Sequence, residues 1–327
     1  RIFTEQADYT ATMTDTPWAN FSWIPDMSIF DPYPKIESML LERNYTSLWI
    51  SQNPDKIKPN IISSAIKRNM LWFCFFKMSP MIFRDVLYDE GLWWSSDTDT
   101  GDIQEFIDFY AVLDYFPQLI DFTATGNRFI CIDNDTTHSN LKLQPPEYEP
   151  AIKVSGNGKG RLASASGYGG NAAAFRLVAK VIEKLKENGV YDNTRIIIAS
   201  DHGIGSDAGE KESFADDFYN DFKRDHLHPV LFVKDFNASG KMKEDMTFMT
   251  LADAPLLALQ GIVENPINPF TGKELTDIIK RTDGAIVSSC ETWSPGQHKV
   301  NAYRIADDEW YTVKDTIFET KNWKKGR

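Results

Sequence analysis

The residues with the clearest chemical potential are an aspartate and a histidine that directly follow an apolar run. Residues 195–200 predict a buried strand, and that strand ends at Asp201, His202 and Gly203. In open α/β sheets, ligands gather just beyond the carboxyl ends of strands. A carboxylate and an imidazole placed there are suitable ligands for zinc or manganese. The alternative is structural, with Asp201 capping the next turn and His202 exposed as a surface histidine.

Two further histidines stand beside predicted strands. His138 follows the apolar run 129–133, and His228 immediately precedes the run 229–234. A single histidine of this kind is more often structural than functional. Because His138, His202 and His228 all stand beside strand ends, we expect some of them to face one cleft.

A nucleophile is sought in the hydroxyl-rich segment 10–16. Thr16 precedes Pro17, which is the pattern of a helix start with threonine at the N-cap and proline at the first helical position. A hydroxyl at a helix N-terminus meets backbone N–H groups and a partial positive charge, which favour a phosphate or a sulfate. A bound metal could lower the pKa of that hydroxyl for attack. The alternative is a helix cap with no chemical role.

The elements that must position these residues follow from the spacing of apolar side chains. Residues 171–188 predict an amphipathic helix that Gly189 ends. The helix joins two predicted strands, 128–133 and 195–200, so this part of the chain predicts a βαβ unit. We therefore expect an α/β fold with a mostly parallel central sheet flanked by helices.

Other segments give weaker local patterns. Residues 35–43 are helix-like, and residues 47–50 predict a further strand. The apolar run Met70–Phe76 is short enough to be one buried strand or one packed helical turn, so we expect it to be buried.

The pattern changes from about Asp283 onward. Residues 300–305 and 309–313 are short alternating segments, which predict a small antiparallel addition. We therefore expect an α/β catalytic domain over residues 1–282 that lacks its first strand, and a small β-rich subdomain over residues 283–327.

Composition excludes several classes of protein. The chain has 327 residues, with 35 Lys or Arg against 47 Asp or Glu and a net charge of −12. Such an acidic chain lacks the basic surface that wraps nucleic acid, so we expect no nucleic-acid partner. Three cysteines without CxxC spacing argue against a disulfide scaffold or a zinc knuckle. No stretch approaches the roughly 20 apolar residues of a membrane-spanning helix.

These residues together resemble the alkaline phosphatase superfamily in its sulfatase-like branch. More narrowly, they resemble the lipoteichoic acid synthase-like phosphoglycerol and phosphoethanolamine transferases. Residues 185–203 carry the most specific likeness, to a family segment that reads L-x-x-x-G-x-Y-D-N-T/S and then S/G-D-H. Residues 134–138, 228–232 and 268–273 resemble other segments of these families.

The resemblance implies a set of roles. Asp201 and His202 would be ligands of one divalent metal, manganese or zinc rather than magnesium. Thr16 would be both the nucleophile and a metal ligand, with Thr12 and Thr14 as alternatives because an ungapped comparison points nearer Thr12. His138 and His228 would bind or protonate the substrate.

The activity implied is transfer of a phosphoglycerol or phosphoethanolamine headgroup. The group would pass from a phospholipid donor to a cell-envelope glycan or lipid through a phospho-threonine intermediate. The resemblance places the protein on the extracytoplasmic face of a bacterial cell membrane. Because the sequence begins at Arg1 rather than Met, we expect transmembrane helices and the first strand to precede it. The acidic metal ligand that family members carry at the end of that strand either precedes Arg1 as well or is absent from this protein.

Two other functions remain open. A phosphodiesterase, phosphatase or sulfatase-like hydrolase of the same fold would use water as the acceptor, and a non-catalytic relative would bind an envelope polymer in the same cleft. The sequence has no Cys/Ser-x-Pro-x-Arg sulfatase signature. Asp15-Thr-Pro-Trp-Ala, where one might look for it, lacks both the modifiable cysteine and the arginine, which argues against a formylglycine sulfatase.

Overall fold

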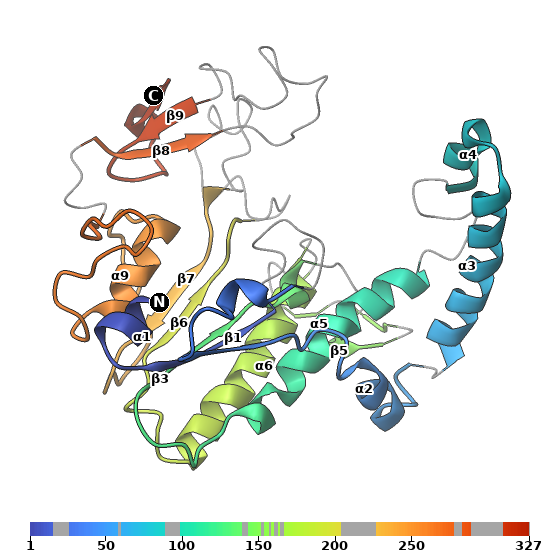
Figure 1. The fold of residues 1–327 in the computed structure, drawn as a ribbon, viewed down its shortest axis with the longest axis horizontal. Coiled ribbons are helices and arrows are strands. Elements are labelled where there is room, and N and C mark those ends of the chain that lie inside the picture. The colour runs from blue at the N-terminus through green and yellow to red at the C-terminus, as the bar shows by residue number, and fades with distance from the viewer. Residues whose placement is uncertain are drawn as a thin grey trace. The chain divides into compact units, whose positions relative to one another are not determined.

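The computed structural model, drawn as a ribbon in Figure 1, describes most of the chain. The described residues are 1–15, 26–57, 60–88, 99–138, 143–151, 154–156, 158–159, 163, 167–203, 227–277, 283–288 and 310–326. They form two compact units. One consists of Ala11–Asn188, and the other combines Arg1–Thr10 with Gly189–Arg327.

A three-stranded sheet of order β2-β1-β3 organises the first unit. Its strands are β1 (Thr10–Thr14), β2 (Ile36–Met39) and β3 (Arg128–Ile132). β1 and β2 pair in parallel, with Ala11 opposite Ile36 and Thr14 opposite Met39. The expected α/β fold with a parallel sheet and helices is therefore confirmed.

Helices supply the core of this unit. They are α2 (Thr46–Gln52), α3 (Asn60–Met78), α4 (Arg84–Tyr88), α5 (Asp99–Leu119) and α6 (Tyr168–Glu187). In Figure 1, α5 and α6 run alongside each other, and their residues are in contact. A single apolar cluster joins α2, α5 and α6 and includes Trp49, Ile50, Phe106, Ile107, Tyr110, Ala173 and Leu177.

The helix predicted over residues 171–188 is confirmed as α6. It begins after Gly167, whose φ of +77° suits a residue without a side chain, and Gly189 follows its end with a φ of +68°. Leu177 and Leu185 on the predicted apolar stripe are buried. The amphipathic pattern therefore identified the face that α6 presents to the core.

Two local predictions were wrong. Residues 36–39 form the strand β2 instead of a helix, because they pair along their whole length with β1. Residues 47–50 lie in the helix α2 instead of a strand. In α2, Thr46, Trp49 and Ile50 are buried at helical spacing, and a segment of four residues with three apolar ones is too short to distinguish the two periods.

The apolar run Met70–Phe76 was also expected to be buried, and this too was wrong. It lies within α3, where Met70, Leu71, Phe73 and Phe75 are exposed. Cys74 in the same run is exposed as well. Within the part of the chain that the structure describes, no helix is long and apolar enough to span a membrane.

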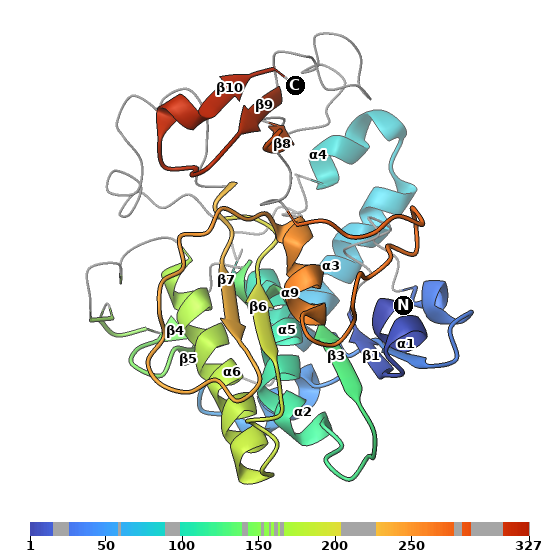
Figure 2. The same cartoon turned by 90° about the vertical axis from the view of Figure 1, so that its left-hand side faces the viewer.

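The second unit contains a two-stranded ribbon and several short elements. Its strands β6 (Ile196–Ala199) and β7 (Leu231–Lys234) pair in antiparallel fashion, and Figure 2 shows them side by side. The strand after α6 is thus present as predicted, but its described partner is antiparallel. The helices are α1 (Ile2–Gln6) and α9 (Ala254–Leu259), and α9 contacts β6.

A separate antiparallel sheet of order β10-β9-β8 lies in the C-terminal region. Its strands are β8 (Ala285–Ser288), β9 (Trp310–Val313) and β10 (Trp323–Lys325). The antiparallel addition and the strand predicted over residues 309–313 are confirmed. Residues 300–305 lie outside the described residues, and the domain boundary at residue 282 stays a prediction.

Candidate functional site

The turn after β6 carries the first pair of predicted site residues. Asp201 and His202 follow the strand at its carboxyl end, after Ser200. The Asp201 Oδ1 atom accepts a hydrogen bond of 2.9 Å from the backbone N–H of His202. This local bond folds the turn, and it leaves both side chains exposed, at 88% for Asp201 and 56% for His202.

The imidazole of His202 has a defined orientation. Its Nδ1 atom lies 2.6 Å from the carbonyl oxygen of Gly203, so Nδ1 carries the proton and donates it. The other ring nitrogen, Nε2, lies 3.7 Å from Asp201 Oδ2. A carbonyl that fixes the tautomer in this way is typical of histidines that bind metal through the other nitrogen.

The antiparallel ribbon brings His228 to the same end as Asp201 and His202. The register pairs Ala199 with Leu231, so the residues after β6 and those before β7 continue side by side. Asp201 and His202 thus share one ribbon end with His228, a residue more distant in the sequence. Because the strands are antiparallel, the carboxyl end of one strand and the amino end of its neighbour form this edge.

His228 differs from His202 in its surroundings. Its ring packs edge-on against Phe318, with centroids 5.0 Å apart and an interplanar angle of 85°. Burial lowers the pKa of His228 below its ordinary value. A neutral imidazole at this place can donate through one nitrogen and accept through the other.

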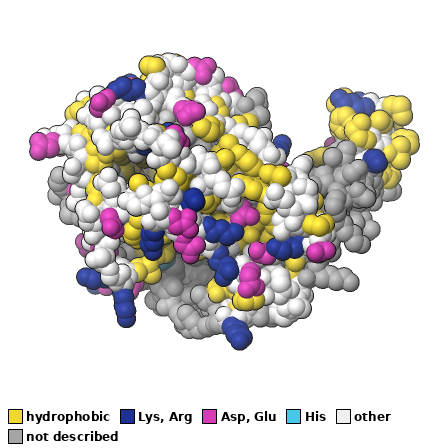
Figure 3. All heavy atoms as spheres, turned by 90° about the horizontal axis from the view of Figure 1, so that it is seen from below, with side chains coloured by type: hydrophobic (Ala, Val, Ile, Leu, Met, Phe, Trp, Pro, Cys, Tyr) yellow, Lys and Arg dark blue, Asp and Glu magenta, His cyan; other side chains and the backbone are white. Residues whose placement is uncertain are grey.

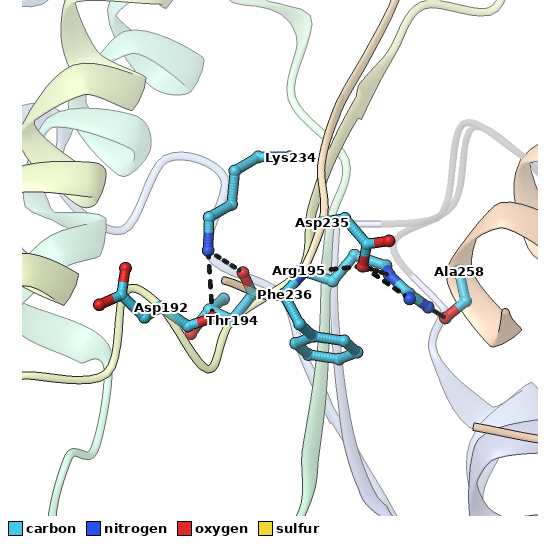
Figure 4. Close-up of polar contacts among 7 residues, drawn as sticks. All are labelled: Asp192, Thr194, Arg195, Lys234, Asp235, Phe236 and Ala258. Carbon is cyan, nitrogen blue, oxygen red and sulfur yellow. Dashed lines mark hydrogen bonds and ion pairs between the residues drawn. The ribbon is translucent and has the colours of Figure 1, made fainter. Parts of the chain in front are cut away.

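The opposite end of the ribbon is held by two charged side chains that Figure 4 shows. Arg195 donates to Asp235 Oδ1 from Nε at 2.9 Å and from a terminal nitrogen at 2.7 Å. Its other terminal nitrogen donates to the carbonyl of Ala258 at 2.8 Å, so Arg195 ties α9 to both strands. The guanidinium also lies 4.5 Å above the ring of Phe236.

Lys234, the last residue of β7, also holds this end of the ribbon. Its ammonium group donates to the carbonyl of Tyr191 and, at 2.8 Å, to that of Thr194. Asn237 binds the same turn through a bond of 2.7 Å from its N–H to the carbonyl of Asp192. The Tyr-Asp-Asn-Thr segment that carries the family resemblance therefore forms a turn that anchors β6.

In the other unit, the carboxyl end of β1 carries Thr14 and Asp15. Thr14 is 1% exposed, and its buried hydroxyl has no hydrogen-bond partner among the described residues. Asp15 has a φ of +53°, and its Oδ1 atom accepts hydrogen bonds from the N–H groups of Leu41 at 2.7 Å and Glu42 at 2.9 Å. Burial nevertheless raises the pKa of Asp15.

Further acidic side chains lie beside this strand end, and sequence reasoning did not single them out. Burial raises the pKa of Glu42, and the negative charges of Asp108, Asp15 and Asp135 raise it further. Arg43 opposes them with ion pairs of 3.0 Å to Glu42 and 3.4 Å to Asp108. Asp108 was hidden within the apolar sequence of α5, where only its burial in the fold distinguishes it.

His138 stands at the same edge of the β2-β1-β3 sheet. It follows a short 3-10 helix, Asp135–Thr137, which begins directly after β3. The side chain of Asn134 starts that helix by accepting from the N–H of Thr136 at 3.1 Å, and it donates to the carbonyl of Phe109 at 3.0 Å. His138 is exposed at this edge, as a substrate-binding role requires.

The structure therefore divides the predicted site residues into two groups. Asp201, His202 and His228 share one end of the β6–β7 ribbon. Thr12 and Thr14 lie in β1 and His138 follows β3, so these belong to the other unit. Thr16 lies outside the described residues, and the assignment of the nucleophile stays a prediction.

The donor chemistry at Asp201 and His202 fits a divalent metal, although it supplies only two donors. A carboxylate and an Nε2 lone pair suit zinc or manganese. Within the described ranges, no three His, Cys, Asp or Glu side chains are grouped so that they could hold a metal ion. The third predicted ligand, Thr16, falls outside those ranges.

Comparison with known proteins gives one family match. The family model described as Sulfatase matches residues 39–253, which include Asp201, His202 and His228. No curated protein and no solved structure matches the chain significantly.

Proposed function

The chain belongs to the Sulfatase family, and we propose that it transfers a phosphoglycerol or phosphoethanolamine headgroup from a phospholipid to a cell-envelope glycan or lipid. Membership itself indicates a sulfatase-like hydrolase or transferase. The headgroup and the acceptor are inferred from the likeness of residues 185–203 to the lipoteichoic acid synthase-like transferases.

One observation carries the proposal. His202 donates from Nδ1 to the carbonyl of Gly203, its Nε2 atom lies 3.7 Å from Asp201 Oδ2, and both side chains are exposed. An exposed carboxylate-imidazole pair with a defined tautomer is suited to bind a metal and, through it, a phosphoryl group.

We assign one divalent metal, manganese or zinc, to Asp201, His202 and Thr16. Superfamily members use divalent metals, and the two described ligands have suitable chemistry. When bound, such an ion neutralises phosphoryl charge and lowers the pKa of a coordinated hydroxyl.

The residues of the chain then perform two substitutions at phosphorus. The Thr16 hydroxyl loses its proton and its oxygen forms a bond to phosphorus, while the bond from phosphorus to the diacylglycerol oxygen breaks and that oxygen takes up a proton. An acceptor hydroxyl next loses its proton and forms a bond to phosphorus, while the bond from phosphorus to the Thr16 oxygen breaks and the threonine hydroxyl is restored by a proton. His228, neutral because burial lowers its pKa, and His138 would hold the phosphoryl oxygens by N–H donation.

The proposal includes partners and a location. The donor is a phospholipid and the acceptor is an envelope glycan or lipid, so the reaction takes place at a membrane surface. We propose that the surface is the extracytoplasmic face of a bacterial membrane. The acidic balance of the chain supports no nucleic-acid role.

Release of diacylglycerol from phosphatidylglycerol or phosphatidylethanolamine tests the proposal. We expect activity that disappears on chelation and returns with manganese or zinc. Asp201→Asn, His202→Gln and Thr16→Ala should each lower it by about a hundredfold or more. Glu264→Gln, which removes a charge from an exposed carboxylate in the same unit, is the matched control.

Product analysis separates the possible outcomes. Headgroup phosphate attached to an added glycan or lipid supports transfer, whereas free glycerol phosphate in the presence of acceptor identifies a hydrolase. An Asp201→Asn protein with unchanged turnover would contradict the assigned site, and an unimpaired Thr16→Ala protein would contradict the nucleophile.

A further inference from the structure

One surface of the chain is strongly apolar although it lies outside the core. We define the apolar tip as seven residues from the second half of α3 and the turn that follows it: Met70, Leu71, Phe75, Met78, Met81, Ile82 and Phe83. All seven side chains are exposed. Figure 3 shows hydrophobic side chains gathered around Lys and Arg at its right-hand edge, over α3 and α4.

The four α3 residues of the apolar tip share one side of their helix. Successive helical positions are separated by about 100°, so Met70, Leu71, Phe75 and Met78 fall within a sector of about 140°. The exposed Lys67 lies in the same sector one turn earlier, and the exposed Lys77 borders it. This is the amphipathic arrangement of a helix that contacts an apolar phase through one face.

The turn after α3 adds three exposed apolar side chains to this surface. Met81, Ile82 and Phe83 are consecutive, and Met81 is 80% exposed and Ile82 79% exposed. Burying side chains of this size would stabilise the fold, and the fold does not gain that stabilisation here. Side chains this exposed project from the surface, and a fluid lipid interface accommodates projecting groups without a matching groove.

Charge identifies the contacting surface. Residues 67–88 contain Lys67, Arg68, Lys77 and Arg84 against the single acid Asp85, a net of +3 in a chain whose total is −12. Lys77 lies 5.2 Å from the ring centroid of Phe73 and Arg84 lies 5.5 Å from that of Phe76, so both cations lie against aromatic rings of the helix that carries the apolar tip. In a two-fold symmetric contact between two copies through this surface, the same positive charges would face each other.

We propose that the apolar tip inserts into the interface of an anionic phospholipid bilayer, with Lys67, Lys77 and Arg84 contacting the headgroups. Apolar side chains at the acyl boundary and cations at headgroup level are the two components of interfacial binding. The proposal goes beyond the transfer reaction, because it concerns a different surface and requires no turnover.

Vesicle flotation with the full chain tests the proposal. The protein should float with vesicles of phosphatidylcholine and phosphatidylglycerol in equal parts, and much less with phosphatidylcholine alone. The triple variant Met81→Ser, Ile82→Ser, Phe83→Ser should bind about tenfold more weakly or worse. The double variant Met242→Ser, Phe270→Ser is the matched control, because these residues are 82% and 86% exposed outside the apolar tip.

Two further measurements test whether the positive charge and the α3 surface contribute to vesicle binding. Lys77→Glu should weaken binding to the anionic vesicles about fivefold or more, while Lys243→Glu should have little effect. Cys74 is exposed on α3, so anionic vesicles should slow its alkylation as followed by mass spectrometry. A circular dichroism spectrum like that of the unmodified chain shows that each variant has folded.

Several results would overturn the proposal. One is equal flotation of the triple variant and the unmodified chain, and another is no flotation of the unmodified chain with anionic vesicles. Self-association that the triple variant abolishes, without vesicle binding, would make the apolar tip a contact between copies. A failure of headgroup transfer with intact flotation would contradict only the proposed function.

Discussion

Ser200 and Val230 exchange two hydrogen bonds across the end of the β6–β7 ribbon. The N–H of Ser200 donates to the carbonyl of Val230 at 3.1 Å, and the N–H of Val230 donates to the hydroxyl of Ser200 at 2.9 Å. The second bond extends the ladder through a side chain, at the point where both strands end. It therefore sets the positions from which the Asp201-His202 turn and His228 depart.

Ser200→Ala removes the hydroxyl that pairs with the N–H of Val230. We expect the free energy of unfolding to fall by about 0.5–1.5 kcal/mol, because one net hydrogen bond is lost. Urea denaturation measures this, and Ser200→Thr should restore most of the loss since it keeps an acceptor oxygen. A Ser200→Ala protein with unchanged stability would show that the bond to the hydroxyl contributes nothing to the free energy of unfolding.

Arg195→Lys tests the clamp at the other end of the ribbon. A lysine cannot reach both Asp235 and the Ala258 carbonyl with the fork geometry of a guanidinium, and the Arg195 side chain is only 8% exposed. We expect a loss of about 1–3 kcal/mol in denaturant unfolding. Arg128→Lys is the matched control, because its single ion pair to Asp121 is 3.7 Å long, and it should change stability by less than about 0.5 kcal/mol.

Asp15 should show opposite effects in two variants. Asp15→Ala leaves the N–H groups of Leu41 and Glu42 without their acceptor and should cost about 1–3 kcal/mol. Asp15→Asn keeps an acceptor oxygen and removes a buried charge, so at neutral pH it should be at least as stable as the unmodified chain. Equal losses in both variants would contradict this account.

The pH dependence of the same residue follows from its raised pKa. The folded chain binds the Asp15 proton more tightly than the unfolded chain does, so this group's contribution to stability falls as pH rises from the ordinary pKa of 3.8 through the raised value. Asp15→Asn should remove that decline. Thermal unfolding across the acidic range measures it, and identical profiles for the two proteins would refute the assignment.

His228 should contribute a pH dependence of the opposite sense. Its pKa is lowered by burial, so the unfolded chain binds the proton more readily. The contribution is therefore constant above the ordinary pKa of 6.5 and destabilises the fold as pH falls below it. His228→Gln should flatten this acid-side loss in thermal unfolding, and an unchanged slope would assign the loss to other groups.

The α6 helix and the strand β6 show where sequence reasoning succeeded. A twenty-residue helix repeats its apolar pattern several times, and a β-branched run such as Ile196–Ile198 favours an extended backbone. The segments 35–43 and 47–50 failed because each is too short for its period to be read. Pairing with β1 made the former a strand, and packing of Trp49 against α5 made the latter a helix.

The candidate site likewise contains residues that the sequence identified and residues that it did not. Asp201 and His202 are adjacent in the chain and follow an apolar strand, so their joint exposure at a strand end could be predicted. Asp15, Glu42 and Asp108 could not be found, because nothing in their local sequence distinguishes them from surface acids. The raised pKa values of Asp15 and Glu42, and the closeness of Asp108 to them, arise only after β1, β2 and α5 come together.

The sequence by itself determined the α/β class, the acidic charge, the strand that leads to Asp201 and His202, and membership of the Sulfatase family. These properties depend on composition and on patterns within one element. Only the tertiary structure decided that His228 lies at the same ribbon end as His202, and that the apolar run in α3 is exposed. Both depend on which surfaces meet, and residues far apart in the chain determine that by hydrogen bonding and packing.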